Sequence, residues 1–229
     1  VRLVRLPAGD KNLLRASIID NTEHKRVEAA LQRRSEQIQR HRDVLLQLAR
    51  ADKSDFDRAL RTITAQAAMT MEIARVSYWS LQENDSALVC ELLHGSQSVT
   101  VDAGFKGTRL SAASAPAYFT ALALKRPIAA GDVRTHPATA GLVGSYLQPL
   151  GITSLLDVPV WVRGEVVGVI CHEHVGPARE WSAEEIDFAS SLAAMVSVAL
   201  EESHRAHSEQ LLRESEEKFK ALFALSPLG

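Results

Sequence analysis

The most reactive side chains of this sequence stand together in one short segment, Cys171–His174, which reads Cys-His-Glu-His. His172 and His174 are two positions apart, so on a strand both would point to the same face, as a metal site requires. No third ligand lies nearby, and we interpret the two histidines as polar positions at the end of a sheet. Cys171 faces the opposite side as a core residue. No metal site is predicted.

The other candidate groups are isolated along the chain. Cys90 and Cys171 are its two cysteines, too few for a disulfide framework or a four-thiolate zinc site. His136 stands before a proline in a loop, where it lines a pocket, ligates haem or, more simply, occupies a turn. His41 has no phosphotransfer motif or ATP-binding domain around it, so we interpret it as a solvated or register-setting residue. No catalytic residue is predicted, and this segment is expected not to be an enzyme.

The composition narrows the functional class. The chain has 229 residues, 46% of them hydrophobic, and a formal net charge of -2, which favours one domain with a core plus flanking helices. This charge does not favour a nucleic-acid partner. No apolar run approaches the roughly 20 residues that cross a bilayer, so we expect no membrane contact within this segment and a cytoplasmic location.

The first part of the sequence predicts a hairpin followed by a long helix. Apolar and polar residues alternate over residues 1–20, with turn chemistry at residues 7–10. Residues 22–51 contain no glycine or proline and carry an apolar repeat with alternating spacings of four and three, which is typical of a coiled coil. Two of the seven positions, Arg34 and His41, are polar and weaken the seam.

The central part alternates helix and strand patterns around an irregular, glycine-bearing stretch. An amphipathic helix is expected over 54–72, and strands over 75–81, 87–93, 154–162 and 165–174. Residues 95–153 hold seven glycines and short helical stretches at 115–124 and 138–147, and long connections of this kind tend to carry ligands. A second long helix is expected from Ser182.

The segment Gly151–Gly176, followed by Arg179–Ala189, resembles the second half of a GAF domain, and Ile128–Val133 is similar to the strand before its variable loop. The resemblance covers about residues 36–203. It implies an α+β fold, in which an antiparallel sheet of about five or six strands lies between helices. It also implies long N- and C-terminal signalling helices, and loops that enclose a pocket on one side of the sheet.

The two ends of the chain resemble parts of PAS domains. Ala16–Leu31 is similar to the closing strand and exit helix of one PAS domain, and Ser215–Gly229 to the first helix of another. The predicted organisation is therefore a PAS hairpin over 1–22, a linker or coiled-coil helix over 23–53, a GAF domain over 54–203, and a linker helix with the start of a second PAS domain over 204–229.

The resemblance implies a small-molecule pocket and a dimer. We expect the pocket to be bounded by sheet and lid residues, namely Tyr78, Cys90, Phe119, His136, Leu142, Tyr146 and Leu150. A homodimer is expected through the two long helices, with contacts at Val27, Leu31, Ile38, Leu45, Leu48, Leu192, Val196 and Ala199.

The identity of a ligand stays open. Bilin-binding GAF domains of the phytochrome type carry a cysteine just before a Tyr-Leu pair, and here the pair is Tyr146-Leu147 with Gly144 at the matching position. A covalent bilin is therefore not expected, whereas a noncovalent chromophore remains possible. The pattern of cyclic-nucleotide-binding GAF domains is not visible. No cofactor is certain, and an unknown small-molecule ligand is possible.

The function that we expect is a noncatalytic sensory and regulatory GAF module of a multidomain signalling protein. Its partners would be a second copy of the chain and the adjacent PAS and output domains, with a sensor histidine kinase as the favoured output. Alternatives are the input module of a diguanylate cyclase or phosphodiesterase, and a noncovalent photosensor. Some stand-alone GAF proteins resemble methionine sulfoxide reductases, but those depend on loop cysteines, and none lies between Cys90 and Cys171.

Overall fold

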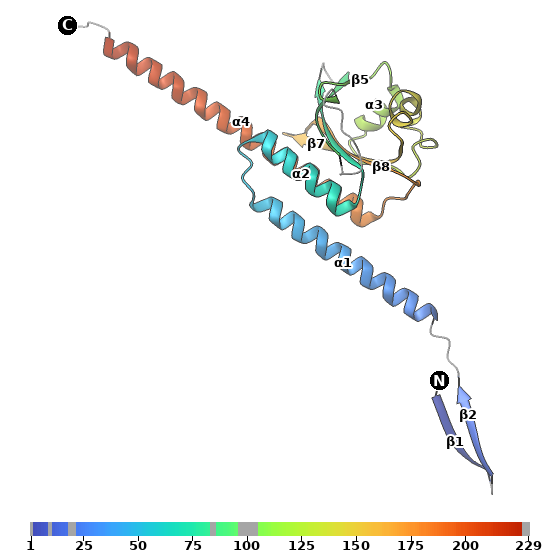
Figure 1. Cartoon of the computed structure of the whole chain (residues 1–229). Helices are drawn as coiled ribbons and strands as arrows, with labels where there is room; N and C mark the ends of the chain where they lie inside the picture. The colour runs from blue at the N-terminus through green and yellow to red at the C-terminus, as the bar shows by residue number, and fades with distance from the viewer. Residues whose placement is uncertain (1, 9–10, 18–21, 83–85, 96–104, 226–229) are drawn as a thin grey trace. The chain divides into compact units, whose positions relative to one another are not determined.

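The computed structural model describes residues 2–8, 11–17, 22–82, 86–95 and 105–225. It divides the chain into two compact units, Val1–Arg40 and His41–Gly229. Each unit is described by itself, and the labels follow Figure 1.

The first unit holds the predicted hairpin and most of the first helix. Strand β1 (Arg2–Ala8) pairs antiparallel with β2 (Lys11–Ser17), while two of the predicted turn residues, Gly9 and Asp10, lie outside the described residues. Helix α1 (Thr22–Arg50) follows. Of its predicted seam residues in this unit, Val27 is 53% exposed, Leu31 62% and Ile38 45%.

A six-stranded antiparallel sheet forms the centre of the second unit, in the order β5-β4-β3-β8-β7-β6. Figure 1 labels its strands β5, β7 and β8. The prediction of five or six strands is thus confirmed. Strand β5 was not predicted from the sequence, because three residues at the sheet edge show no periodicity. The bounds of the strands are β3 (Arg75–Gln82), β4 (Ala87–Gly95), β5 (Arg109–Ser111), β6 (Ile128–Ala130), β7 (Ile152–Val162) and β8 (Glu165–Val175).

Helices cover one face of this sheet. Helix α2 (Phe56–Met71) begins after Asp55, whose carboxylate accepts a hydrogen bond of 3.0 Å from the backbone N–H of Arg58, as an N-cap does. Helix α4 (Ala183–Leu225) packs against β7 and α2. Together with the last turns of α1, these helices bury side chains that include Leu60, Ile63, Phe188 and Leu192.

Short helical turns and loops cover the opposite face. They are α3 (Pro116–Ala123), the 3-10 turn η2 (Ala140–Leu142) and the π-helical turn η3 (Val143–Leu147). A second core cluster lies beneath them, formed by Trp79, Leu88, Tyr118, Leu155 and Val169 among others. The sheet therefore has two distinct buried faces, one under long helices and one under a lid of short elements.

Four residues predicted at the dimer seam are buried within the chain's own domain. Leu48 is 2% exposed, and Leu192, Val196 and Ala199 are fully buried. Their spacing therefore reflects packing inside the domain, since the same apolar period serves a helix that packs on its own sheet. Leu45 is half-buried against the same core.

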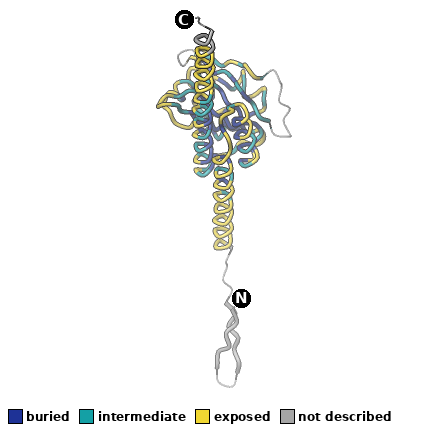
Figure 2. Tube along the Cα trace, turned by 90° about the vertical axis from the view of Figure 1, so that its left-hand side faces the viewer, coloured by how far each residue is buried: buried dark blue, intermediate teal, exposed yellow. Residues whose placement is uncertain are grey.

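His41 is a further correction. It is 6% exposed and stacks on the ring of Phe188 in α4, with centroids 4.2 Å apart and planes inclined by 18°. It is therefore not a solvated residue, because the last turns of α1 pack against α4. In Figure 2, most residues of α1 before His41 and of the distal part of α4 are exposed.

Within the described residues, no helix is both long and apolar enough to cross a membrane.

Candidate functional site

Strand alternation places a row of polar side chains on the sheet face beneath the lid. In the central strands Ser77 is paired with Cys171, and Cys171 in turn with Asp157. One step along, Arg75 is paired with Glu173. Because side chains directly opposite one another share a face, these five groups project to the same side. All of them are buried.

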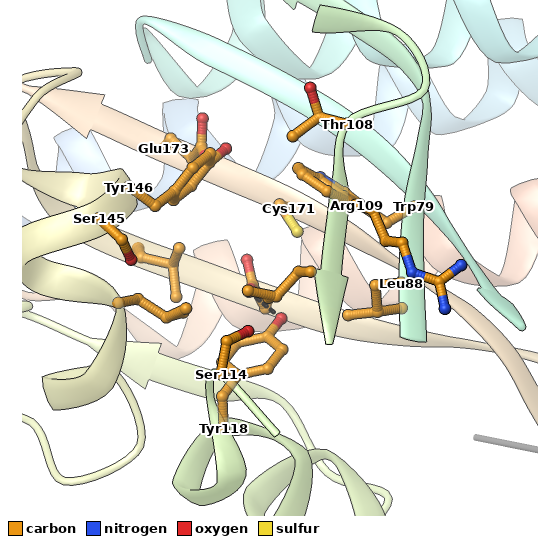
Figure 3. Close-up of a pocket in the computed structure, with 14 residues that line it drawn as sticks. Trp79, Leu88, Thr108, Arg109, Ser114, Tyr118, Ser145, Tyr146, Cys171 and Glu173 are labelled. Atoms are coloured by element: carbon orange, nitrogen blue, oxygen red, sulfur yellow. Dashed lines mark hydrogen bonds between the residues drawn. The ribbon is translucent and has the colours of Figure 1, made fainter. Parts of the chain in front are cut away.

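A cavity of about 220 Å³ lies between this row and the lid. Figure 3 shows side chains reaching into it from the lid, among them Tyr118 and Tyr146, and from the sheet, among them Cys171 and Glu173. Trp79 and Leu88 close one side, as strands β3 and β4 provide them. The full lining is Trp79, Leu88, Thr108, Arg109, Leu110, Ser114, Tyr118, Leu142, Ser145, Tyr146, Leu155, Asp157, Cys171 and Glu173.

Asp157 is the first of two buried acids in the cavity wall. The hydroxyl of Tyr118, from α3, donates a hydrogen bond to its Oδ2, whereas its buried Oδ1 makes no hydrogen bond to any described residue. Burial raises the pKa of Asp157 to about 7, an effect that the hydroxyl of Tyr118 and the thiol of Cys171 oppose. This carboxyl therefore changes its charge near neutral pH.

Glu173 is the second acid, and both of its oxygens have partners. Arg75 donates from Nε to Oε2 over 2.9 Å, and the hydroxyl of Tyr146 donates to Oε1 over 2.6 Å. Burial raises the pKa of Glu173, while the charge of Arg75 opposes the rise. The guanidinium also lies over the ring of Phe105, 4.9 Å from its centroid. This ion pair is thus built into the wall.

The aromatic side chains of the cavity hold one another in place. Trp79 donates from Nε1 to the hydroxyl of Ser77 over 2.9 Å, so its indole is fixed along the strand. Tyr146 and Phe105 each meet it edge to face, with centroids 6.0 and 5.9 Å away. Such contacts are favourable for aromatic pairs, and they give the cavity a firm aromatic side.

The two cysteines are protonated thiols in this setting. Burial raises the pKa of Cys90 to about 12 and that of Cys171 well above its ordinary value. Both are free and buried. Since the thiolate is the nucleophile and the metal ligand, neither is prepared for thiol chemistry.

The structure brings two of the seven predicted pocket residues, Leu142 and Tyr146, to the cavity wall. Cys90, Phe119 and Leu150 belong to the core cluster on the same side of the sheet without lining the cavity. Tyr78 lies on the helix-covered face, where its ring meets Phe56 edge to face at 5.7 Å. The prediction that Tyr78 lines the pocket is therefore wrong, and its neighbour Trp79 lines the cavity instead.

The histidines lie away from the cavity. His172 is fully buried, and its Nδ1 lies 2.9 Å from the carbonyl oxygen of Leu156. Burial lowers its pKa to about 4, so the ring is neutral. Burial also lowers the pKa of the partly buried His174. The Nδ1 of His136 accepts a hydrogen bond from the N–H of Ala138 over 3.3 Å, which is the arrangement of a turn.

The sequence interpretation did not single out Asp157, Glu173 or Tyr118. A signal existed for the first two, because each is an acid in the interior of a strand rich in apolar residues, and acids are rarely buried without a partner. Tyr118 carries no comparable signal, since its position depends on how the lid folds over the sheet.

The fold and the cavity define an α+β domain in which a sheet separates helices from a lidded cavity. The GAF domain family model matches residues 55–200, more than half of the chain. The chain therefore belongs to the GAF domain family, as the sequence resemblance indicated. A search of curated protein sequences finds no match for it.

Solved structures share this fold at low sequence identity. The GAF domain of the Acinetobacter phosphoenolpyruvate-protein phosphotransferase is similar with a TM-score of 0.58 and 18% identity, covering 74% of this chain and 95% of that one. Free methionine-R-sulfoxide reductase from Neisseria meningitidis, in complex with its substrate, gives 0.57 and 21% over 72% and 91%. The GAF domain of the cyanobacteriochrome TePixJ gives 0.53 and 21% over 68% and 96%. At these identities the likeness concerns the fold alone.

Proposed function

We propose that this chain is a noncatalytic sensory module, in which occupancy of the GAF cavity is passed to the long helices α1 and α4. The observation that carries the proposal is that one sheet forms both the cavity wall and the helix-packing face. In β7, Asp157 lines the cavity while the next residue, Val158, belongs to the helix-side core. A shift of this strand therefore reaches both sides, since packed interfaces move between discrete arrangements.

A direct link between the sheet and α4 supports this coupling. The hydroxyl of Ser197, in α4, accepts a hydrogen bond of 3.2 Å from the backbone N–H of Trp161 at the end of β7. The fully buried Leu192 and Val196 anchor the same helix on the sheet. Beyond this region α4 continues to Leu225 and is exposed over residues 207–220. This exposed stretch is the part that would transmit a displacement.

The partner that we propose for the exposed helix is a second copy of the chain. Val27, Leu31 and Ile38 are exposed on α1 and follow the four-three spacing of a coiled-coil seam. In a homodimer these residues would be covered, and the seam would couple the two modules. The adjacent domains that we propose are the PAS domains indicated by the two ends, with a sensor histidine kinase as output.

Two activities found among the structural neighbours are less well supported. Reductase chemistry needs a thiolate, and burial keeps both cysteines protonated. A tetrapyrrole chromophore is several times larger than a cavity of about 220 Å³, and Gly144 provides no thiol for attachment. An absorption spectrum above 350 nm and an assay with free methionine sulfoxide test these alternatives directly.

Light scattering tests the dimer. We expect about twice the chain mass of 25.0 kDa, and a monomer for the double variant Leu31→Asp/Ile38→Asp, because two charges would be buried at the seam. Ala29→Asp is the matched control, since residue 29 is exposed on the opposite side of the helix, and it should leave the dimer intact. A wild-type monomer would contradict the proposed relay.

A further inference from the structure

The two acids of the cavity differ in how completely they are satisfied. Glu173 accepts hydrogen bonds on both oxygens and faces the cation Arg75. Asp157 accepts one on Oδ2 from Tyr118, and the thiol of Cys171 is a second donor close to the carboxyl, but no donor of the described residues meets the geometry of a hydrogen bond to Oδ1. An unsatisfied buried acceptor is costly. Asp157 is 1% exposed and lines the cavity, so a molecule in the cavity can supply the missing donor.

The size of the cavity limits that molecule. A cavity of about 150 Å³ holds benzene, with its six non-hydrogen atoms, so by proportion the cavity of about 220 Å³ holds about nine. One substituted ring or a small fused ring meets this limit. The aromatic side chains of Trp79, Tyr118 and Tyr146 in the wall favour a planar shape.

The charges around the cavity limit the ligand further. Two carboxyls, Asp157 and Glu173, face the cavity from the buried sheet. Arg75 compensates the charge of Glu173, although its own buried Nη2 has no hydrogen-bond partner among the described residues, so Asp157 is the carboxyl that would repel an anion. Arg109 is the cation among the lining residues, and it is exposed, so water screens it. A ligand cation would compensate Asp157, and the faces of Trp79 and the two tyrosines attract cations as well.

We propose that the cavity binds a small planar organic cation with N–H donors, of the amidine, guanidine or protonated amino-heterocycle class, through a hydrogen-bonded ion pair with Asp157. Tyr118 is the positioning residue, because its hydroxyl fixes Oδ2 and leaves Oδ1 for the ligand. This inference deepens the proposed function by naming the ligand class of the sensory cavity, and it rests on that function.

The test uses three probes of nearly identical shape, each with nine non-hydrogen atoms. Benzamidine is cationic, benzamide neutral and benzoate anionic. Isothermal titration calorimetry of the whole chain at pH 8 should show benzamidine binding about tenfold or more tighter than benzamide, because a hydrogen bond to a charged group is the stronger one. Benzoate should not bind. Equal binding of benzoate and benzamidine, or no binding of benzamidine, would overturn the proposal.

Two variants identify the carboxyl. Asp157→Asn should weaken benzamidine about tenfold or more and leave benzamide within about threefold, while Asp187→Asn removes an exposed acid of α4 and should change neither. Unaltered benzamidine binding by Asp157→Asn would refute the assignment. Urea unfolding shows whether the variants are folded.

The pH dependence of the wild type provides a test that needs no variant. Between pH 8 and pH 6 benzamidine should weaken about tenfold as Asp157, whose pKa is about 7, becomes protonated; benzamide should stay constant. The titratable groups around Asp157 are Tyr118 from α3 and Cys171 and Glu173 from β8. A flat benzamidine profile would contradict the proposal.

Light scattering of the same samples separates this inference from the proposed relay. A dimer that ignores benzamidine would overturn the ligand class and leave the relay standing. A monomer that binds benzamidine through Asp157 would support the ligand class and remove the relay.

Discussion

The two faces of the central sheet are built from the same strands but differ in composition: one is an apolar core and the other includes buried acids beside a cavity. On the helix side, Leu156, Val158 and Ile170 form a filled apolar core, and burial keeps the neighbouring ring of His172 neutral. On the lid side, the alternate positions Asp157 and Glu173 are acids beside a cavity of about 220 Å³.

We infer from this difference that the helix side contributes mainly to stability and the lid side to ligand recognition. Dense apolar packing gives the helix side its contribution to folding, whereas the lid side includes buried polar groups that are stable only with partners. Strand alternation lets one residue serve the first task and the next residue the second. The following predictions, in order of decreasing effect, test that division.

The largest effect is expected on the lid side, where Arg75 is paired with Glu173. Replacement by Arg75→Met leaves a buried carboxylate without its cation and should lower the free energy of unfolding by about 3–5 kcal/mol. Urea unfolding measures it. The double variant Arg75→Met/Glu173→Gln should recover most of the loss, because the neutral amide still accepts from Tyr146. A loss below about 1 kcal/mol would mean that the pair does not hold this face together.

Leu155 and Leu156 form a matched pair on opposite faces, 2% and 0% exposed. Leu156→Ala opens a void in the filled core and should cost about 3–4 kcal/mol. Leu155→Ala enlarges a cavity that already exists, so fewer contacts are lost, and the cost should be about 2 kcal/mol. The comparison is made by urea unfolding under identical conditions. Equal costs would show that the two faces are packed alike.

The two faces should respond to pH with opposite signs. The pKa of Asp157 is raised from 3.8 to about 7 on folding, so its contribution to stability is present at low pH and is lost as the pH rises through 7. The pKa of His172 is lowered from 6.5 to about 4, so its contribution is present above 6.5 and is lost as the pH falls through 4. Between pH 5 and pH 7 each group changes the free energy of unfolding by about 2 kcal/mol. The two changes have opposite signs and nearly cancel.

Replacing one of the two groups removes its pH dependence and leaves the pH dependence of stability that the other group causes. Compared with the wild type, Asp157→Asn should lose about 2 kcal/mol more stability on acidification from pH 7 to pH 5, and His172→Asn should lose about 2 kcal/mol less. Urea unfolding at the two pH values measures both. Parallel profiles for the three proteins would show that neither group changes its pKa on folding.

The sequence predicted the long elements of the domain well. The helix expected over 54–72 is α2 (Phe56–Met71), and the strands expected over 154–162 and 165–174 lie within β7 and β8. These segments have strong periodicity, which follows from burial of one face. The short β5 lacks any such pattern, so its existence depends on pairing with β4.

The site was harder to predict because it depends on which face each residue meets. Tyr78 was expected at the cavity and Trp79 was not, and a shift of one residue reverses the face of a strand. In the same way, the apolar period of α1 predicts a partner surface without saying which molecule supplies it. From His41 onward that surface is provided by the chain's own domain.

The smallest effect is expected where the helix side ends, at the stacked rings of His41 and Phe188. His41→Ala removes this contact near the edge of the core and should cost about 1 kcal/mol, less than any change at the centre of the sheet. The neighbouring Arg42 is exposed, so Arg42→Ala is the control and should be neutral in urea unfolding. If His41→Ala proved equally neutral, the last turns of α1 would not stabilise the domain, and the filled helix side would be limited to α2 and α4.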